Sequence, residues 1–224
     1  YTDGHRPAVS TSQPSPGQFA VAYDDLLARG CTEILSIHVS GAMSGTLNAA
    51  RLAAHSLPIP VRLVDSSTAS FGISCCVWAA AAAIADGATL DQAAQIAEQL
   101  APSIGNVFVV GALDHLHAGG RGTGLAHGDD LAMLTLRDGN VEVVERLATA
   151  LDAVNAMASY AIGWGTTVRV AVGHSDAATQ PLADGLEAAV GEAASVIDVV
   201  RYRVGPSVGA HTGPGTVGCF VFPA

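Results

Sequence analysis

Residues 33–54 read EILSIHVSGAMSGTLNAARLAA, and the prediction of the fold builds on this segment. An apolar run gives way to a turn of small residues between Ser40 and Gly45, after which apolar side chains recur with helical spacing. The order predicts a strand, a tight turn and a helix. The start of such a helix presents unpaired backbone N–H groups beside Ser and Thr hydroxyls, a combination that favours a bound anion. An ordinary capped helix is the other interpretation, because Ser is a preferred N-cap residue.

A second stretch of the same kind follows. Residues 61–64, VRLV, form a short apolar run that leads into the polar turn 65–70 and then into an alanine-rich helix over residues 72–85. Two strand–turn–helix stretches in succession predict parallel strands joined by a right-handed crossover, with both polar turns on one edge of the sheet. We therefore expect a binding site at that edge.

The remaining sequence predicts further α/β structure. Helices are expected over residues 19–29, 90–100, 113–120, 147–162 and 177–194, and strands over 106–110, 133–136, 141–144, 168–172, 197–204 and 219–222. The Asp138-Gly139 pair predicts a hairpin turn. The fold class is therefore α/β with two domains. Residues 1–100 form the first, with a parallel sheet flanked by helices, and residues 101–224 the second, with a mixed or antiparallel sheet and helices.

Composition argues against several classes of function. The 224 residues carry a net charge of −10, and the ten basic residues are all Arg. Binding to nucleic acid needs a basic surface, and a P-loop needs its Lys, so we expect neither. No apolar run is long enough to span a membrane, which predicts no stable insertion and leaves only transient membrane contact. The four cysteines lack CxxC spacing, and their apolar surroundings fit a reducing cytoplasm and no bound metal.

Residues 205–216, GPSVGAHTGPGT, lie between the last two predicted strands. Four glycines and two prolines predict a sharply shaped loop with His211 and Thr212 at its centre. An ordinary glycine-rich connection with a surface His is the alternative. Together with the Ser/Thr-rich turns, the loop suggests an anion site of neutral donors, which suits a single carboxylate better than a polyphosphate.

Two other functions use the same residues. Ser40 or Ser44, with His211 as base and an Asp such as Asp65, would make a serine esterase or acyltransferase, although no GxSxG motif is present. A sugar-phosphate binder on the same sheet edge is the other. His38, on the first strand, is expected to be a hydrogen-bonded core histidine, and the spacing of the histidines at 115, 117 and 127 does not favour a metal site.

Five ordered motifs, which span nearly the whole chain, resemble the DegV family. They are TSQPSPG at 11–17, the turn from Ser40 to Thr46, VDSST at 64–68 followed by Gly72, GGR at 119–121, and the GP and HTGPG runs within 205–215. The resemblance implies a bacterial protein that binds a long-chain fatty acid and presents it to a separate fatty acid kinase, which phosphorylates the carboxyl group. It implies no catalytic activity of the chain itself and no cofactor, with the fatty acid as the bound ligand.

Carried over position by position, the resemblance implies a set of carboxylate-binding residues. The set is Thr11, Ser12, Ser40, Ser44, His211 and Thr212. Of the two serines in the turn Ser40 is favoured, but the spacing does not decide. The acyl chain is expected in an apolar tunnel at the interface of the two domains, with Ile73 and Val77 among its lining residues. Arg121 is a candidate for docking the kinase or for anchoring its own loop.

Two features depart from the family. The sequence lacks the family's N-terminal strand with its Thr-Asp-Ser turn, which we interpret as truncation, processing or an incomplete sequence. The run after Arg121, GTGLAHGDD, is shorter and more polar than the apolar segment usual there, which affects part of the expected tunnel wall.

Overall fold

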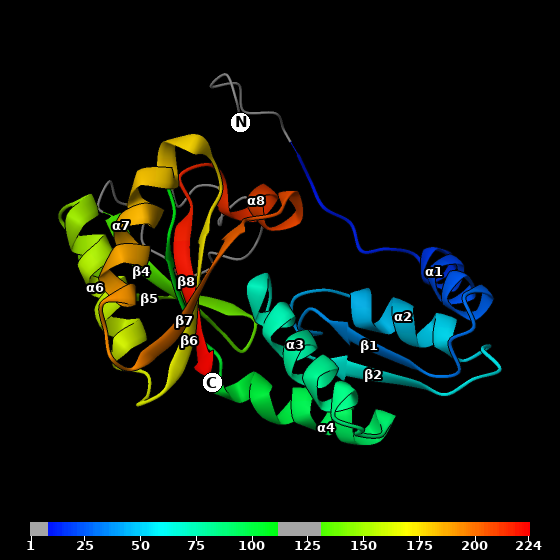
Figure 1. The fold of residues 1–224 in the computed structure, drawn as a ribbon. Coiled ribbons are helices and arrows are strands. Elements are labelled where there is room, and N and C mark those ends of the chain that lie inside the picture. The colour runs from blue at the N-terminus through cyan, green and yellow to red at the C-terminus, as the bar shows by residue number, and fades with distance from the viewer. Residues whose placement is uncertain (1–8, 112–130) are drawn as a thin grey trace. The chain divides into compact units, whose positions relative to one another are not determined.

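The structure, a computed structural model, describes residues 9–111 and 131–224, which fall into two compact units (Figure 1). One unit is Ser12–Ser103, and the other is Ile104–Ala224 with the residues up to Thr11. The sequence places Thr11 in the first domain, whereas in the structure it belongs with the second unit. The helix predicted over 113–120, Arg121 and the polar run after it lie outside the described residues.

The unit Ser12–Ser103 is built on two parallel strands flanked by helices, as the sequence predicts. Its elements are α1 (Pro16–Ala28), β1 (Ile34–His38), α2 (Thr46–Ala54), β2 (Val61–Asp65), α3 (Phe71–Ala85), α4 (Leu90–Leu100) and a 3-10 turn at Ala101–Ser103. The strands pair in register from Ile34 opposite Val61 to His38 opposite Asp65. α1 and α2 pack together on one side of this sheet, and α3 and α4 on the other (Figure 1).

The start of α1 differs from the prediction. The helix begins at Pro16 rather than at residue 19, because Ser15 accepts the N–H of Gln18 and the Gln18 side chain accepts the N–H of Ser15. This reciprocal pair is a capping box, and proline at the first helical position costs no hydrogen bond. Pro14 and Pro16 therefore flank the N-cap residue Ser15. α4 begins with a capping box of the same kind, between Thr89 and Gln92.

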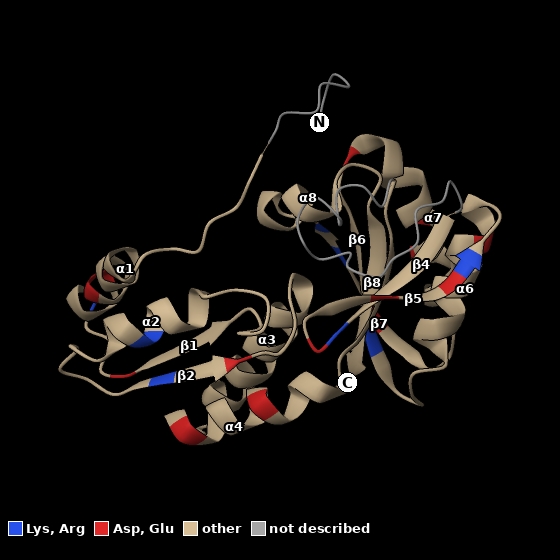
Figure 2. Cartoon of the chain, turned by 180° about the vertical axis from the view of Figure 1, so that it is seen from behind, with Lys and Arg blue, Asp and Glu red and all other residues tan. Residues whose placement is uncertain are grey.

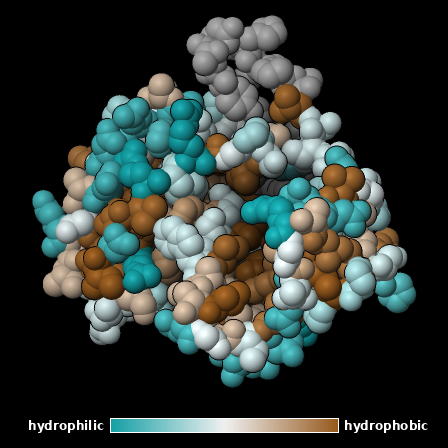
Figure 3. All heavy atoms as spheres, turned by 45° about the vertical axis from the view of Figure 1, so that its right-hand side comes forward, coloured by the Kyte–Doolittle hydropathy of each residue, from teal (hydrophilic) through white to brown (hydrophobic). Residues whose placement is uncertain are grey.

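Small side chains allow the helices of this unit to approach closely. Residues that are at most 2% exposed include Ala49, Ala50, Val64, Cys75, Cys76, Ala80, Ala93, Ala94 and Ala97. α3 is apolar around most of its circumference, so part of it reaches the surface, with Val77 44% exposed and Trp78 42% exposed. Apolar surface of this kind is brown in Figure 3, where it alternates with hydrophilic surface on the face in view.

The second unit contains a six-stranded mixed sheet, as predicted. Its elements are β3 (Gly105–Val109), β4 (Leu131–Arg137), β5 (Asn140–Leu147), α6 (Ala150–Ile162), β6 (Val168–His174), a 3-10 turn at Ala177–Thr179, α7 (Gln180–Gly191), β7 (Val196–Arg203), α8 (Pro206–Thr212) and β8 (Val217–Pro223). The strand order is β5-β4-β3-β8-β6-β7, and of these neighbours β6 and β7 are parallel and the others antiparallel. The hairpin turn is confirmed, since Asp138 and Gly139 both have positive φ, 51° and 79°.

α6 and α7 cover one face of this sheet (Figure 1). Every second residue along the strands packs against these helices in the core, as Val168, Val170 and Val172 of β6 do. By the same alternation, Phe108 of β3 and Phe220 of β8 point to the opposite face. α6 begins at Ala150 and not at the predicted residue 147, because β5 continues to Leu147 and the Thr149 hydroxyl caps the helix.

Candidate functional site

Ser40 forms the inside of the turn between β1 and α2. It is only 4% exposed, and its N–H donates to the carbonyl of Thr68 at 2.9 Å. Its hydroxyl accepts the N–H of Ala42 at 3.3 Å. These contacts give Ser40 a structural role in closing the turn, and little of its side chain is accessible to a ligand.

Ser44 lies at the other end of the same turn and is half-buried. Its hydroxyl shares a hydrogen bond of 2.7 Å with the Thr46 hydroxyl and accepts the N–H of Thr46 at 3.3 Å. Gly45 is the N-cap of α2 and provides no side-chain cap, so the Ser44 and Thr46 hydroxyls stand at an open helix start. A side chain at Gly45 would overlap the Gln13 amide, so the segment after Thr11 passes directly over this turn.

The two polar turns of the unit meet, as the sequence predicts. The carboxylate of Asp65 accepts the N–H of Gly41 at 3.0 Å and the N–H of Ser67 at 2.8 Å. Ser66 N–H donates to the carbonyl of His38 at 3.1 Å. Asp65 therefore ties the first turn to the second at the carboxyl ends of the parallel strands, where α/β proteins commonly bind ligands.

Behind these turns lies a buried chain of hydrogen bonds that the sequence reasoning did not anticipate. Tyr23 shares a hydrogen bond of 2.9 Å with the Ser36 hydroxyl, which shares one of 2.8 Å with Nε2 of His38. Burial lowers the pKa of His38, and the negative charge of Asp65 offsets part of this shift. The prediction of His38 as a hydrogen-bonded core histidine is confirmed. The polar residues Ser36 and His38 of β1 share a face, and this alternate spacing is the signal in the sequence that could have indicated the chain of hydrogen bonds.

The predicted glycine-rich loop at 205–216 is wrong in its first half, which forms α8 (Pro206–Thr212). Pro206 takes the first position of that helix, where its missing N–H is harmless, and Gly213, with φ of 74°, ends it. Nε2 of His211, in the last turn, shares a hydrogen bond of 2.7 Å with the hydroxyl of Thr11, 200 residues away in sequence. The structure thus brings together two residues of the predicted set.

The other members of the set have different surroundings. Thr212 is 8% exposed, and its hydroxyl donates to the Val208 carbonyl at 3.3 Å, which closes the helix. Ser12 is exposed and belongs to the unit of Ser40 and Ser44. Ser44, His211 and Asp65 of the esterase alternative each have a hydrogen-bond partner outside the triad: Thr46 for Ser44, Thr11 for His211, and Gly41 and Ser67 for Asp65.

The arginines of the unit Ser12–Ser103 are bonded within it, away from the turns. Arg62 contacts Asp91 at 3.0 Å and Glu98 at 3.7 Å, Arg29 contacts Asp25 at 3.9 Å, and Arg51 donates to Asn48 at 3.4 Å. Figure 2 shows the acidic residues of α1 and α4 in red. Among residues 9–111 and 131–224, no group of three His, Cys, Asp or Glu side chains is placed to hold a metal ion. The polar groups at the turns are neutral hydroxyl and N–H donors, with Asp65 satisfied by two N–H groups.

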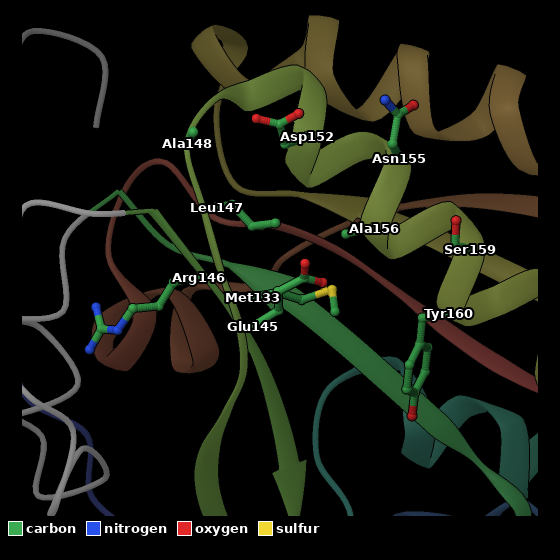
Figure 4. A pocket seen from close by; sticks show the side chains of 10 residues that line it. All are labelled: Met133, Glu145, Arg146, Leu147, Ala148, Asp152, Asn155, Ala156, Ser159 and Tyr160. Atoms are coloured by element: carbon green, nitrogen blue, oxygen red, sulfur yellow. The ribbon is translucent and has the colours of Figure 1, made fainter.

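A surface groove lies apart from these turns. A groove of about 710 Å³ lies between β4, β5 and α6 of the second unit (Figure 4). Its lining residues are Met133, Glu145, Arg146, Leu147, Ala148, Asp152, Asn155, Ala156, Ser159 and Tyr160. The groove contains none of the predicted residues, and its two carboxylates, Glu145 and Asp152, outnumber its one arginine, Arg146, so its net charge does not favour an anion. We therefore assign the candidate site to the turns and not to this groove.

None of the helices within the described part of the chain has the length and apolar character needed to cross a bilayer. Its fold and turns define a two-unit α/β protein with neutral polar groups at strand ends and helix starts. The family model described as "Uncharacterised protein, DegV family" matches residues 3–224. The chain belongs to the DegV family.

The similarity extends to proteins and solved structures from several bacteria. A DegV domain-containing protein of Streptomyces coelicolor is 37% identical over 226 residues, covering 96% of this chain and 79% of that protein. A DegV lipid-binding protein from Thermotoga maritima has a TM-score of 0.88 and 25% identity, with 98% of this chain and 78% of that chain covered. The structure of a DegV family protein from Thermus thermophilus, described by its fatty acid binding, has a TM-score of 0.84 and 29% identity. The match covers 96% of this chain and 79% of that chain.

Proposed function

We propose that this chain binds a long-chain fatty acid and carries it to a separate fatty acid kinase, without catalytic activity of its own. The observation that carries the proposal is the hydrogen bond between Thr11 and His211, which joins two residues of the expected carboxylate set across 200 positions of sequence. The fatty acid binding of the DegV protein from Thermus thermophilus supports the same ligand class. The four free cysteines are compatible with the reducing cytoplasm that the proposal assumes.

The proposed carboxylate-binding groups are the Thr11–His211 pair, the Ser44 hydroxyl and Ser12. Ser44 is preferred to Ser40 because it is half-buried at an open helix start, whereas Ser40 is 4% exposed and occupied in the turn. Thr212 supports α8 through its bond to Val208. A carboxylate that loses water needs partners, since burying it alone costs several kcal/mol.

The acyl chain supplies most of the binding free energy in this proposal. Each buried CH₂ contributes about 0.8 kcal/mol, so a chain of about fourteen methylenes provides on the order of 11 kcal/mol before ordering costs. Apolar side chains suited to this contact are Ile73 and Val77 on α3. The head groups then mainly offset the cost of removing the carboxylate from water.

Solvent extraction and mass spectrometry of the purified protein test the proposal. We expect a co-purified long-chain fatty acid, and uptake of one by protein that has been stripped of lipid. A protein that carries no acyl chain and takes up none would contradict the ligand class. Incubation with a p-nitrophenyl ester separates the esterase alternative, which predicts turnover that is lost in His211→Ala.

The kinase partner needs a separate experiment. Lipid-loaded protein, ATP and a fatty acid kinase should together yield an acyl phosphate, and the loaded protein with ATP alone should not. Product formation without the kinase would contradict the carrier role. Acyl-phosphate formation that does not depend on this chain would contradict the proposed partnership while leaving fatty acid binding intact.

A further inference from the structure

The turn that follows α8 is held by a carboxylate outside the proposed binding set. Asp176, between β6 and α7, accepts the Gly215 N–H at 2.8 Å and the Ser175 hydroxyl at 2.7 Å, both through Oδ2. Its Oδ1 accepts the N–H of Thr179 at 3.1 Å. One side chain therefore joins the end of β6 and the start of the α7 region to the turn that leaves α8.

A second set of bonds continues from that carboxylate to the end of α8. The Ser175 hydroxyl accepts the N–H of Thr216 at 3.0 Å, and Ser175 N–H donates to the Thr216 carbonyl at 2.9 Å. The buried Thr216 hydroxyl donates to the Gly213 carbonyl at 2.9 Å and lies 3.4 Å from the Thr212 carbonyl. This series of hydrogen bonds thus reaches Thr212, the residue that follows His211.

The turn also has little room to move. Gly215 adopts φ of 83°, and a Cβ there would lie 2.6 Å from Cα of Gly111 and 2.9 Å from its nitrogen. The backbone at Gly111 therefore packs directly against the turn, in the space that a side chain at position 215 would occupy. Such a close approach requires glycine at position 215.

α8 needs this external support because it is a weak helix by itself. It spans seven residues, and isolated helices of that length are unstable in water. Gly209, in its middle, further lowers its helix propensity. Its position, and with it that of His211, must then depend on how its ends are fixed.

We propose that Asp176 is a positioning residue for His211. Its carboxylate fixes the turn 213–216, the turn fixes the end of α8, and α8 sets the imidazole against the Thr11 hydroxyl. Burial alone would raise the pKa of Asp176, but hydrogen bonds from Gly215, Ser175 and Thr179 lower it, so the group accepts these bonds as an anion. Asp176 acts through the turn and not as a contact of the ligand. The inference rests on the proposed function, in which His211 receives the fatty acid carboxylate.

Asp176→Asn tests this role, since an amide offers one oxygen acceptor where the carboxylate offers two. Lipid-free protein should bind decanoate about tenfold more weakly after the exchange. In a His211→Ala background the same exchange should change affinity by less than twofold, because residues that act through one another are not additive. Asp152→Asn is the matched control. It changes an Asp at the start of α6, where its Oδ2 accepts the Thr149 hydroxyl at 2.8 Å, and it should leave affinity unchanged.

The ring resonances of His211 provide a readout that does not need the ligand. In ¹⁵N-histidine NMR spectra, Asp176→Asn should shift the His211 ring nitrogens as its bond to Thr11 is lost, while Asp152→Asn should not. The positioning role is overturned if the resonances do not shift, or if Asp176→Asn still weakens decanoate binding tenfold in the His211→Ala background. Ser175→Ala, a milder break in the same set of bonds, replaces Asp176→Asn if that variant does not fold. Wild-type protein that binds no fatty acid would refute the proposed function, and the NMR comparison would still decide this inference.

Discussion

Replacing Ser44 with Ala, with Ser40→Ala as its matched partner, identifies the hydroxyl that receives the carboxylate. The two serines lie four residues apart in one turn and differ in accessibility. Ser44 is half-buried and bonded to Thr46, whereas Ser40 is 4% exposed and closes the turn through Ala42 and Thr68. We expect Ser44→Ala to weaken ligand binding and Ser40→Ala to weaken the fold.

The magnitude follows from the kind of bond that each variant loses. A hydrogen bond to a charged group contributes roughly 1.5–3 kcal/mol. Ser44 is partly exposed and the Thr46 hydroxyl remains beside it, so the lower end applies, about 1.5 kcal/mol, which corresponds to about a tenfold loss of affinity. Ser40→Ala removes a neutral bond to the N–H of Ala42, which corresponds to about 1 kcal/mol of unfolding free energy. Its effect on affinity should stay within about twofold.

Chain length decides whether the assay can detect the difference. A long-chain ligand is held by on the order of 11 kcal/mol of tail burial, so a loss of about 1.5 kcal/mol leaves the site saturated at ordinary concentrations. Decanoate, with about eight methylenes and roughly 6 kcal/mol of tail burial, binds weakly enough for titration calorimetry. Decanol is the control ligand, because it has the same tail and no carboxylate.

For Ser44→Ala, we expect decanoate to bind about tenfold more weakly and decanol nearly as it binds to wild type. Urea unfolding of both variants separates affinity from stability. The reasoning is refuted if Ser44→Ala binds decanoate like the wild type while Ser40→Ala loses tenfold at an unchanged unfolding midpoint. That result would assign carboxylate binding to Ser40.

Three further predictions concern Asp65, the buried His38 and the cysteines. Asp65→Ala should lower the unfolding free energy by about 1 kcal/mol, a small value because the carboxylate is exposed, and unchanged urea unfolding would contradict its role in tying the turns. Burial lowers the pKa of His38 from 6.5, so folding favours the neutral ring. Its stability contribution should be complete above pH 6.5 and decrease as the pH falls below that value. Urea titrations should show that the unfolding free energy falls less between pH 7.5 and pH 5 in His38→Gln than in the wild type. Equal losses in the two proteins would argue against this assignment. With Ellman's reagent, the half-buried Cys31 should react first in the folded protein, because burial raises the pKa of the other thiols to about 12 for Cys75, 11 for Cys76 and 12 for Cys219. Rapid reaction of more than one thiol would contradict their burial.

Local patterns predict much of this fold. β1, α2 and β2 follow from apolar runs that stop at polar turns, and the Asp138-Gly139 turn follows from residues that tolerate positive φ. The late prediction of the α1 start reflects an overlooked signal, the Ser-x-x-Gln spacing from Ser15 to Gln18. Such features depend on neighbours within a few residues, so one sequence is enough to identify them.

α8 is an element that local sequence patterns do not predict. Glycines and a proline make residues 206–212 look like a loop, and their intrinsic preference is indeed weak. The helix forms in a tertiary setting in which the turn after it is held by Asp176 and Ser175, some 40 residues earlier. The Asp-x-x-Thr spacing from Asp176 to Thr179 is a readable capping signal, but it does not reveal the bond to Gly215.

The Thr11–His211 pair depends on information that a single sequence lacks altogether. The two residues are 200 positions apart, and a resemblance can name both without showing that they touch. Their proximity depends on the position of β8 between β3 and β6, next to which the turn after α8 is fixed. Strand order is set by packing of the whole sheet and not by any one stretch.

The chemical character of the described donors explains how a carrier could combine tight binding with a weakly held head group. Hydroxyls and an imidazole offset the loss of water around a carboxylate without the larger desolvation cost of a buried ion pair. Affinity is then determined by the length of the apolar tail, and the head groups determine which chemical group is accepted. Substitutions at Thr11, Ser44 or His211 should therefore alter the preference for acid over alcohol more than the retention of a long chain. An ion pair in their place would make retention depend on the carboxylate and would hinder transfer of that group to another protein.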